Sequence, residues 1–134
     1  MRYTKSLEIF FSPNFSLILD HNLHYYDLRF SNKPMVMLKG HKKAISYVRF
    51  MNSNELFTAS TDNTLKLWNL ENASESLRTY SGHLNERNFV GLSAFDDYIA
   101  CGSETNTVYL YCKAVSNPIL SFKFGNVNPL TVSF

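Results

Sequence analysis

The chain has 134 residues, of which 45% are hydrophobic and 15% aromatic, and this is enough apolar material for one modest core. Its 13 basic and 11 acidic residues give a formal net charge of +2, and its longest basic run is Lys42-Lys43, so the charge pattern argues against nucleic acid and membrane surfaces as partners. No segment reaches the ~18 apolar residues of a membrane-spanning helix.

The first segment, residues 1–19, fits no regular pattern well. It starts with basic residues and has apolar residues later, but Glu8 and the segment SPN at 12–14 interrupt the apolar run. A secretory signal peptide needs an unbroken apolar region of ~7–15 residues. We therefore expect no signal peptide here.

The rest of the chain repeats itself. Tyr26, Trp68 and Tyr111 follow one another at spacings of 42 and 43 residues, and two Gly-His pairs begin 42 residues apart, at Gly40 and Gly82. The segments STDNTLKLW and SETNTVYLY, which end at Trp68 and Tyr111, align without a gap. A period of ~40–45 residues with Gly-His and Trp markers is typical of four-stranded propeller blades.

The local pattern within each repeat indicates β-strands. AISYVRF (44–50) and TLKLWNL (64–70) alternate between two faces, and the segments MNSNE, STDN, NLENASES and SNP supply turns between the apolar runs. No segment of useful length has the period of about 3.6 residues that marks a helix. The sequence predicts an all-β protein.

This repeat resembles that of the WD-repeat β-propeller family, in which four side chains form a hydrogen-bonded tetrad inside each blade. The middle repeat has His41, Ser60, Asp62 and Trp68 at the matching positions. A buried imidazole and a buried indole N–H need partners, and a carboxylate in a turn can supply one. We interpret these four residues as structural rather than catalytic, because the repeat spacing explains them and the chain has no GxSxG motif of a hydrolase.

The flanking repeats depart from this pattern. The third repeat has Thr105 and Tyr111 where an aspartate and a tryptophan are expected. The first keeps Asp20, but has Ile18 in place of the serine and Tyr26 in place of the tryptophan.

Three such repeats account for the whole chain, whereas propellers close with ~4–8 blades. The predicted fold is an all-β, WD40-type β-propeller fragment of about three four-stranded antiparallel blades that do not close into a ring. An open arc exposes sheet faces and edges, and this favours association. The predicted divisions are an atypical N-terminal segment or partial blade at 1–19, the end of the first blade at 20–38, the second blade at 39–81, the third blade at 82–124 and a truncated tail at 125–134.

Two cysteines, Cys101 and Cys112, lie in apolar runs. They are expected to be small buried hydrophobes of a reducing compartment, with a disulfide as the less favoured alternative. They have no CxxC spacing, so they do not predict a zinc site.

The middle and the end of the chain resemble one plant family more closely. Within residues 20–128 the similar segments are GHKKAISYVRF, LFTASTDNTLKLWNL, SGHLNERNFVGLS, YIACGSETNTVYLY and PILSFKFG. They look like the propeller of the constitutively photomorphogenic ubiquitin ligase and of its suppressor-of-phytochrome-A partner proteins. NERNFVGLS and CGSETNTVYLY are not general propeller consensus, so this resemblance is more specific than that to WD repeats at large.

The resemblance implies a function in protein recognition. In that family the propeller is the substrate-recognition domain of a light-regulated nuclear ubiquitin ligase that represses photomorphogenesis. It binds Val-Pro-containing peptides, with acidic residues nearby, from transcription factors and photoreceptors. The resemblance also implies a nuclear location. The chain shows no RING ligands and no kinase motifs, so we expect a non-catalytic module, without a cofactor or a metal.

By the same resemblance, Lys43, Phe89 and His21 match positions that line the peptide groove. Peptide recognition uses an apolar or aromatic anchor ringed by polar groups, and cations attract the acidic flanks of a ligand. Each residue has a plainer alternative: Lys43 as a solvated surface lysine, His21 as a turn residue, and Phe89 as a wedge between blades.

The segment YDLR (26–29) resembles the Asp-x-Arg signature by which some WD-repeat proteins dock onto a cullin-ligase adaptor. Asp27 and Arg29 would make that contact, or they would pair with each other and close the blade.

Two further functions stay open as alternatives. The odd N-terminus and the early end also fit a truncated, non-functional or decoy fragment, and a generic WD-repeat scaffold that docks the adaptor would keep the same motifs. A hydrolase that uses His41 or His83 is disfavoured, because both histidines recur at blade spacing.

Overall fold

The computed structural model describes residues 9–12, 15–19, 21–27, 29, 32–88 and 90–125. Within these residues the chain forms twelve strands in three four-stranded sheets, each with its strands in chain order. The first sheet contains β1 (Ile9–Ser12), β2 (Phe15–Leu19), β3 (Leu23–Asp27) and β4 (Val36–Leu38). The second contains β5 (Ile45–Phe50), β6 (Glu55–Ser60), β7 (Leu65–Asn69) and β8 (Arg78–Tyr80). The third contains β9 (Leu92–Phe95), β10 (Tyr98–Cys101), β11 (Thr107–Cys112) and β12 (Leu120–Lys123).

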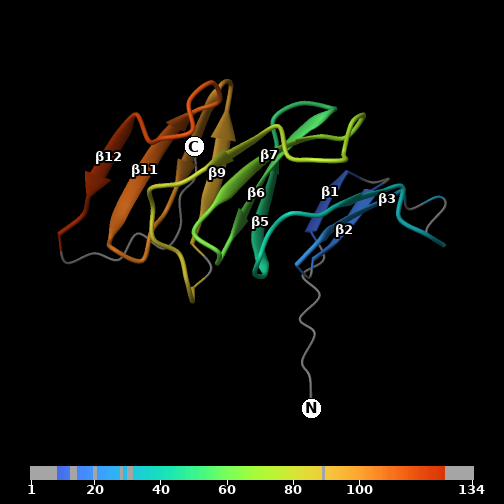
Figure 1. Ribbon diagram of the computed structural model, residues 1–134, viewed down its shortest axis with the longest axis horizontal. Helices are drawn as coiled ribbons and strands as arrows, with labels where there is room; N and C mark the ends of the chain where they lie inside the picture. Colours follow the sequence, from blue (N-terminus) through green and yellow to red (C-terminus); the bar gives the residue numbers. More distant parts are fainter. Residues whose placement is uncertain are drawn as a thin grey trace, which may run out of the picture.

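All neighbouring strands pair antiparallel, and the three sheets follow one another across the molecule as blades of an open arc (Figure 1). The prediction of an all-β fold built from four-stranded antiparallel blades that do not close is therefore confirmed. The division predicted at residues 19 and 20 falls between β2 and β3 of one sheet, so β1 and β2 belong to the first blade.

The strands follow the alternation of the sequence, and the turns depend on residues that tolerate unusual backbone angles. Asn63 in the β6–β7 turn has a φ of 68°, and Asn106 at the equivalent place in the β10–β11 turn has a φ of 56°. Asparagine adopts this left-handed region more readily than most residues. Gly82 has a φ of 124°, and a Cβ at this position would lie 2.9 Å from the Pro118 ring, so only glycine fits without a shift.

Two apolar clusters hold the three blades together. Leu23 of the first sheet packs with Val48 and Trp68 of the second. Phe57 and Tyr80, from the opposite face of the second sheet, pack with the third sheet. This second cluster is completed by Val90, which precedes β9, and by four residues of the third sheet, Leu92, Ile99, Cys101 and Tyr111.

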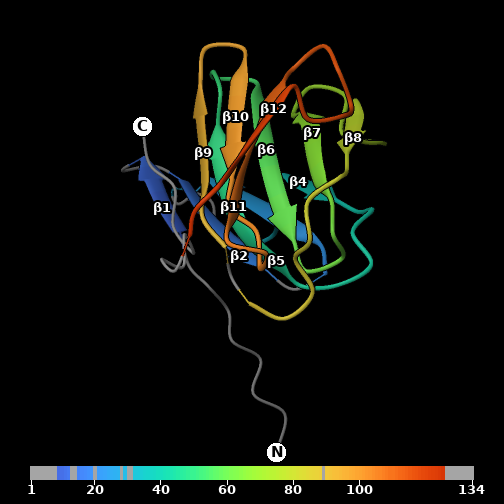
Figure 2. The same cartoon turned by 90° about the vertical axis from the view of Figure 1, so that its left-hand side faces the viewer.

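The other face of the third sheet is open to solvent, and Figure 2 looks onto this sheet. Phe122 lies opposite Val108 in the β11–β12 ladder, just as Tyr80 lies opposite Leu65 in the β7–β8 ladder. Tyr80 is 0% exposed because the third blade covers it, whereas Phe122 is 62% exposed. The described residues contain no helix of the length and hydrophobicity that a membrane crossing requires.

Candidate functional site

One end of the blades collects the loops in which the candidate residues lie. The antiparallel ladders bring the start of β5 beside the end of β6, where Ile45 pairs with Ser60, and the start of β9 beside the end of β10. The described segments at this end, called the loop face below, are 21–22, 39–44, 61–64, 81–88, 90–91 and 102–106.

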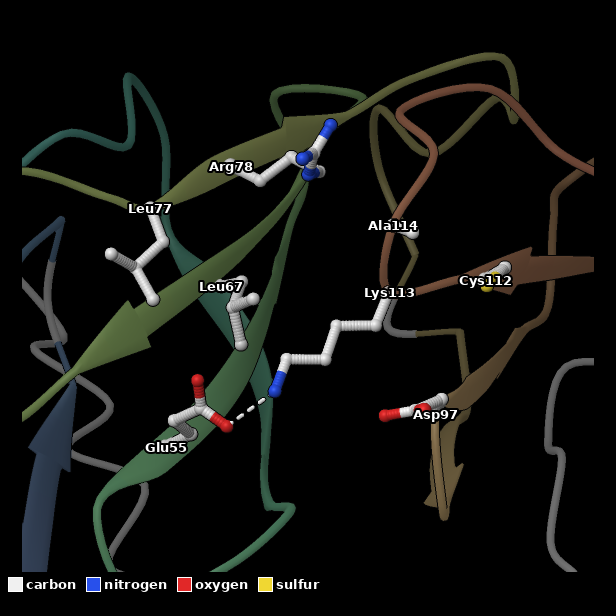
Figure 3. Close-up of a pocket in the computed structure, with 8 residues that line it drawn as sticks. All are labelled: Glu55, Leu67, Leu77, Arg78, Asp97, Cys112, Lys113 and Ala114. Atoms are coloured by element: carbon white, nitrogen blue, oxygen red, sulfur yellow. Dashed lines mark hydrogen bonds and ion pairs between the residues drawn. The ribbon is translucent and has the colours of Figure 1, made fainter.

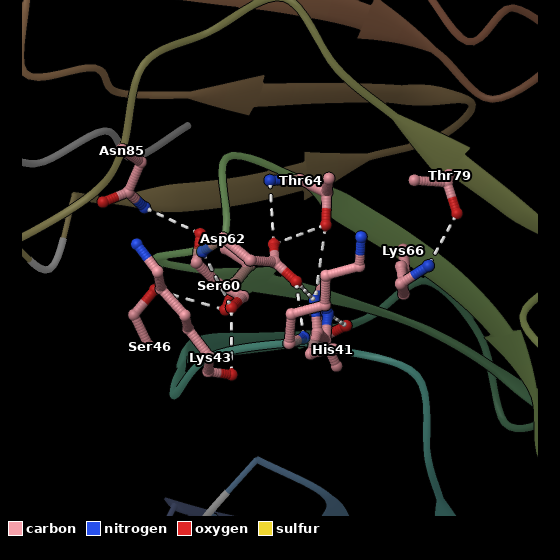
Figure 4. Close-up of polar contacts among 12 residues, drawn as sticks. His41, Lys43, Ser46, Ser60, Asp62, Thr64, Lys66, Thr79 and Asn85 are labelled. Carbon is pink, nitrogen blue, oxygen red and sulfur yellow. Dashed lines mark hydrogen bonds and ion pairs between the residues drawn. The ribbon is translucent and has the colours of Figure 1, made fainter.

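Asp62 is the hub of the loop face in the second blade (Figure 4). Its Oδ2 atom accepts hydrogen bonds from His41 Nδ1 and from the amide of Lys42, both at 2.9 Å. Its Oδ1 atom accepts from the hydroxyl of Thr64 at 2.6 Å and from the Thr64 amide at 3.0 Å. Burial alone would raise the pKa of Asp62, but the bonds from His41, Thr64 and Lys42 hold it well below its usual range.

The buried indole and imidazole of this blade share one hydroxyl. Trp68 Nε1 donates to Thr58 Oγ1 at 2.9 Å, and Thr58 Oγ1 lies 2.6 Å from His41 Nε2. A neutral His41 with its proton on Nδ1 satisfies every group, because Thr58 then donates to Nε2 while His41 donates to Asp62. The resulting chain runs from indole to hydroxyl to imidazole to carboxylate.

The prediction that Ser60 joins the imidazole and the indole is wrong, since Thr58 does so. Trp68 lies opposite Leu56 in the β6–β7 ladder, and Thr58 is the next residue on the same face of β6. Ser60 lies two residues further along the strand, roughly 7 Å away. Its hydroxyl instead donates to the carbonyl of Lys43 at 3.2 Å and accepts from the Asp62 amide at 3.2 Å.

Thr58, His41 and Asp62 have the order of a hydroxyl, imidazole and carboxylate relay, but the geometry does not suit catalysis. Thr58 is 0% exposed, so no substrate reaches its oxygen. That oxygen also accepts the indole N–H of Trp68, so the hydroxyl is fully used within the core. Among the described residues, no group of three or more His, Cys, Asp or Glu side chains could hold a metal ion.

The third blade has a reduced version of this network. His83 Nδ1 lies 2.8 Å from the hydroxyl of Tyr111, and Thr105 bonds to Ser103 and Thr107. His83 Nε2 is buried and has no hydrogen-bond partner among the described residues. Burial lowers the pKa of His83 to about 4.

The two cysteines are free. Cys101 takes the place of Thr58 in the third blade, and burial raises the pKa of its thiol to about 12. A buried thiol of this kind is unreactive, and it does not supply the hydroxyl that Thr58 provides to His41 Nε2, which agrees with the lack of a partner at His83 Nε2.

Of the three predicted peptide-contacting residues, Lys43 and His21 are exposed on the loop face. Lys43 follows His41 and Lys42, whose contacts with Asp62 fix the start of its loop, and its carbonyl is held by Ser60. Phe89 lies outside the described residues.

A second network joins the loop between β8 and β9 to both neighbouring turns. Asn85, which is 0% exposed, donates from its amide to Asn63 Oδ1 at 2.6 Å and from its side chain to the Ser60 carbonyl. Glu104 accepts from the amides of Arg87 and Asn88. The repeat pattern does not predict these pairings, because each contact crosses from one sheet or loop to another.

Asp27 and Arg29, the predicted adaptor-docking pair, bind each other. Arg29 Nη2 lies 2.7 Å from Asp27 Oδ2 and Arg29 Nε lies 3.0 Å from Oδ1, which is a two-pronged ion pair at the end of β3. The hydrogen bonds from Arg29 lower the pKa of Asp27. The Arg29 side chain is 64% exposed, so this local pair leaves part of the guanidinium open to solvent.

A cavity of about 350 Å³ lies at the opposite end of the second and third blades (Figure 3). Its wall includes Glu55, Arg78, Asp97 and Lys113. Lys113 Nζ lies 2.6 Å from Glu55 Oε2 and neutralises it. The cavity shares no residue with the loop face, so it is separate from the candidate peptide site.

Comparison with known proteins identifies the repeat. The family model described as "WD domain, G-beta repeat" matches residues 32–69 and 74–112. Each matched repeat begins before the last strand of one sheet and ends with the third strand of the next, so β4 and β8 belong by sequence to the repeat that follows their sheet. The Crystal Structure of Mitotic Checkpoint Complex contains a similar fold, with a TM-score of 0.73 at 20% identity, over 84% of this chain and 35% of that chain.

Several plant proteins are similar in sequence. The E3 ubiquitin-protein ligase COP1 of Arabidopsis thaliana is 52% identical over 107 residues, which cover 80% of this chain and 16% of the ligase. Protein SUPPRESSOR OF PHYA-105 1 of the same plant is 51% identical over 119 residues, or 84% of this chain and 12% of that protein. The WD repeat-containing protein RUP1 is 41% identical over 111 residues, or 81% of this chain and 29% of that protein. The resemblance noted from the sequence is thus confirmed, although the chain spans only a small part of these curated relatives.

Proposed function

Because this chain belongs to the WD40-repeat family, we propose that it is part of a peptide-binding, substrate-recognition module of a ubiquitin ligase complex. Its ligand is a Val-Pro-containing peptide with acidic residues nearby, supplied by a transcription factor or a photoreceptor. The module itself is not catalytic. The similarity to a protein named E3 ubiquitin-protein ligase supports this proposal.

The observation that carries the proposal is the exposed Lys42-Lys43 pair. Hydrogen bonds hold the backbone of this pair at its first amide and at its last carbonyl. Asp62 accepts from the Lys42 amide, and Ser60 donates to the Lys43 carbonyl. Both side chains are exposed, so their charges face solvent while their backbone is held. A cation on an ordered rim attracts the acidic flank of a peptide and adds to the specificity of its binding.

The proposal also includes a nuclear location and a role in the light-regulated repression of photomorphogenesis. These two points rest on the family resemblance alone. His21 and Phe89 are proposed to line the same groove on the same basis.

Reversing the charge of Lys43 tests the peptide site. We expect Lys43→Glu to raise the dissociation constant of an acidic Val-Pro peptide roughly three- to tenfold, because the steering cation becomes an anion of the same sign as the ligand. Fluorescence anisotropy with the labelled peptide measures this, and the effect should shrink at high salt.

Lys33→Glu is the matched control, since Lys33 is also exposed but lies in the β3–β4 connection. It should leave the dissociation constant unchanged. If both substitutions raise the dissociation constant equally, Lys43 acts only through the net charge of the chain. If neither changes it, Lys43 does not contact the peptide.

A second candidate function is docking onto a cullin-ligase adaptor through Asp27 and Arg29. The observation in its favour is the 64% exposure of the Arg29 side chain in an orientation that Asp27 fixes. This surface and the loop face would serve different partners of one complex.

A further inference from the structure

We propose that Glu104 is a positioning residue that fixes the loop segment 84–88 on the loop face and so pre-forms the peptide-binding rim. This inference rests on the proposed function, because it assigns a role to the rim on which peptide binding is proposed. It concerns a carboxylate that the blade tetrad does not use.

The geometry around the Glu104 carboxylate supports this role. Its Oε1 atom accepts the amide of Arg87 at 2.8 Å and the amide of Asn88 at 2.6 Å. Two successive backbone N–H groups that point at one anion form a nest, an arrangement that normally binds a carboxylate or a phosphate. Here the anion comes from the β10–β11 turn of the same blade, sixteen and seventeen residues further along the chain.

Glu104 and its neighbour also hold the start of this loop segment. The Glu104 amide donates to the Leu84 carbonyl at 3.0 Å. Ser103 Oγ accepts from the Leu84 amide at 3.2 Å and donates to the Leu84 carbonyl at 2.9 Å. The segment is therefore fastened to the β10–β11 turn at both of its ends.

The opposite side of the segment is fastened to the second blade. Asn63, held in its left-handed turn, accepts from the Asn85 amide and donates to Glu86 Oε1 at 3.3 Å. The segment thus bridges two blades, and the backbone at its exposed residues Arg87 and Asn88 has little freedom left to lose when a ligand binds.

The electrostatics agree with this geometry. Burial would raise the pKa of Glu104, but the amides of Asn88, Arg87 and Glu86 lower it below the usual range. The carboxylate is therefore charged at neutral pH, and hydrogen bonds to a charged acceptor are among the stronger ones in proteins.

The test combines amide hydrogen exchange with peptide binding in the full chain. We expect Glu104→Ala to speed exchange of the Arg87 and Asn88 amides by about tenfold or more, since their shared acceptor is lost. Glu104→Gln keeps an oxygen at the same place without the charge, so it should restore much of the protection. Glu75→Ala is the matched control. Glu75 is exposed in the β7–β8 connection, and its substitution removes the same charge far from the loop segment.

The binding arm uses the labelled acidic Val-Pro peptide. Glu104→Ala should weaken binding several-fold and Glu104→Gln less, while Glu75→Ala should have no effect. Unchanged exchange in Glu104→Ala would overturn the positioning role, and so would faster exchange with unchanged peptide affinity. If the unsubstituted chain binds no peptide, the proposed function fails, and the exchange data alone then decide whether Glu104 fixes the segment.

Discussion

At the scale of single residues, one hydroxyl in the second blade satisfies two buried ring nitrogens. Thr58 lies between the indole of Trp68 and the imidazole of His41, and both rings are in the core. A buried donor or acceptor that loses its partner costs about 1–3 kcal/mol, so the stability of this blade depends strongly on Thr58.

Replacement of Thr58 by valine tests this dependence. Thr58→Val keeps the shape but leaves Trp68 Nε1 and His41 Nε2 without a partner, so we expect a loss of about 2–5 kcal/mol of unfolding free energy. Ser60→Ala removes only contacts to backbone groups and should cost about 1 kcal/mol. Urea denaturation measures both, and Thr58→Ser should keep most of the stability. A larger loss for Ser60→Ala than for Thr58→Val would contradict the network.

His83 gives the chain a built-in sensitivity to acid. Its folded-state pKa of about 4 lies below the unfolded value of 6.5, so the unfolded chain binds more protons between these two values. The neutral, buried His83 therefore contributes to the unfolding free energy fully above about pH 6.5. This contribution is lost as the pH falls towards about 4, and the total loss is about 3 kcal/mol.

The measurement compares the unfolding free energy of the unsubstituted chain with that of His83→Gln between about pH 7 and about pH 4.5. The variant cannot titrate at this position, so its stability should fall less over this range. His21→Gln is the control for the removal of an exposed histidine. Parallel curves for the unsubstituted chain and His83→Gln would show that His83 is not the sensitive group.

The sequence predicts the members of this network better than their connections. The repeat spacing identifies His41, Asp62 and Trp68, because a buried ring and a turn carboxylate recur at fixed places. It does not distinguish Thr58 from Ser60, since both are hydroxyl residues on one face of β6 and only the β6–β7 register decides between them. Similarly, the bond from Asn85 to Asn63 depends on how two blades sit together.

At the scale of elements, β12 differs from the corresponding strand β8. Its residues are exposed along its whole length, and the aromatic rings of Phe122 and Phe124 pack against each other at 4.9 Å between centroids. Phe95 at the end of β9 is 71% exposed. The equivalent face of the second blade is covered by the third, so this face has the shape and chemistry of a surface that packs against another blade.

Self-association of the isolated chain is the expected result of this open face. Phe95→Lys combined with Phe122→Lys should shift the chain towards the monomer in size-exclusion chromatography, because two buried charges would oppose packing of the face. Met35→Lys is the control, since Met35 is 60% exposed but lies before β4 in the first blade. A monomeric unsubstituted chain with a normal thermal transition would contradict this expectation.

The sequence predicts the strands of the second and third blades better than those of the first. The second and third blades have Gly-His pairs, turn asparagines and an aromatic at matching spacing, so their strands follow from the sequence. The first blade lacks a Gly-His pair and has Ile18 where the serine is expected, yet β1 and β2 join its sheet. Backbone pairing does not require the tetrad residues, so their absence hides a blade from the sequence without preventing its formation.

At the scale of the whole molecule, the described parts of the three blades form a row, in which one apolar cluster joins the first blade to the second and another joins the second to the third. Stability in such an array is approximately the sum of blade terms and interface terms. Substitutions in the cluster around Trp68 should therefore weaken the first and second blades together, and substitutions around Tyr80 the second and third.

The offset between the sequence repeat and the sheet also decides how tension would pass along the chain. Each connection to the next blade leaves from an edge strand of only three residues, β4 or β8, that is still hydrogen-bonded to the previous sheet. A pull that separates two blades would therefore peel these short strands from their ends at Leu38 and Tyr80, one bond at a time. At the far end of each connection, the β5–β6 and β9–β10 ladders pair five and four residues, against three in the β3–β4 and β7–β8 ladders, so β4 or β8 would come away first.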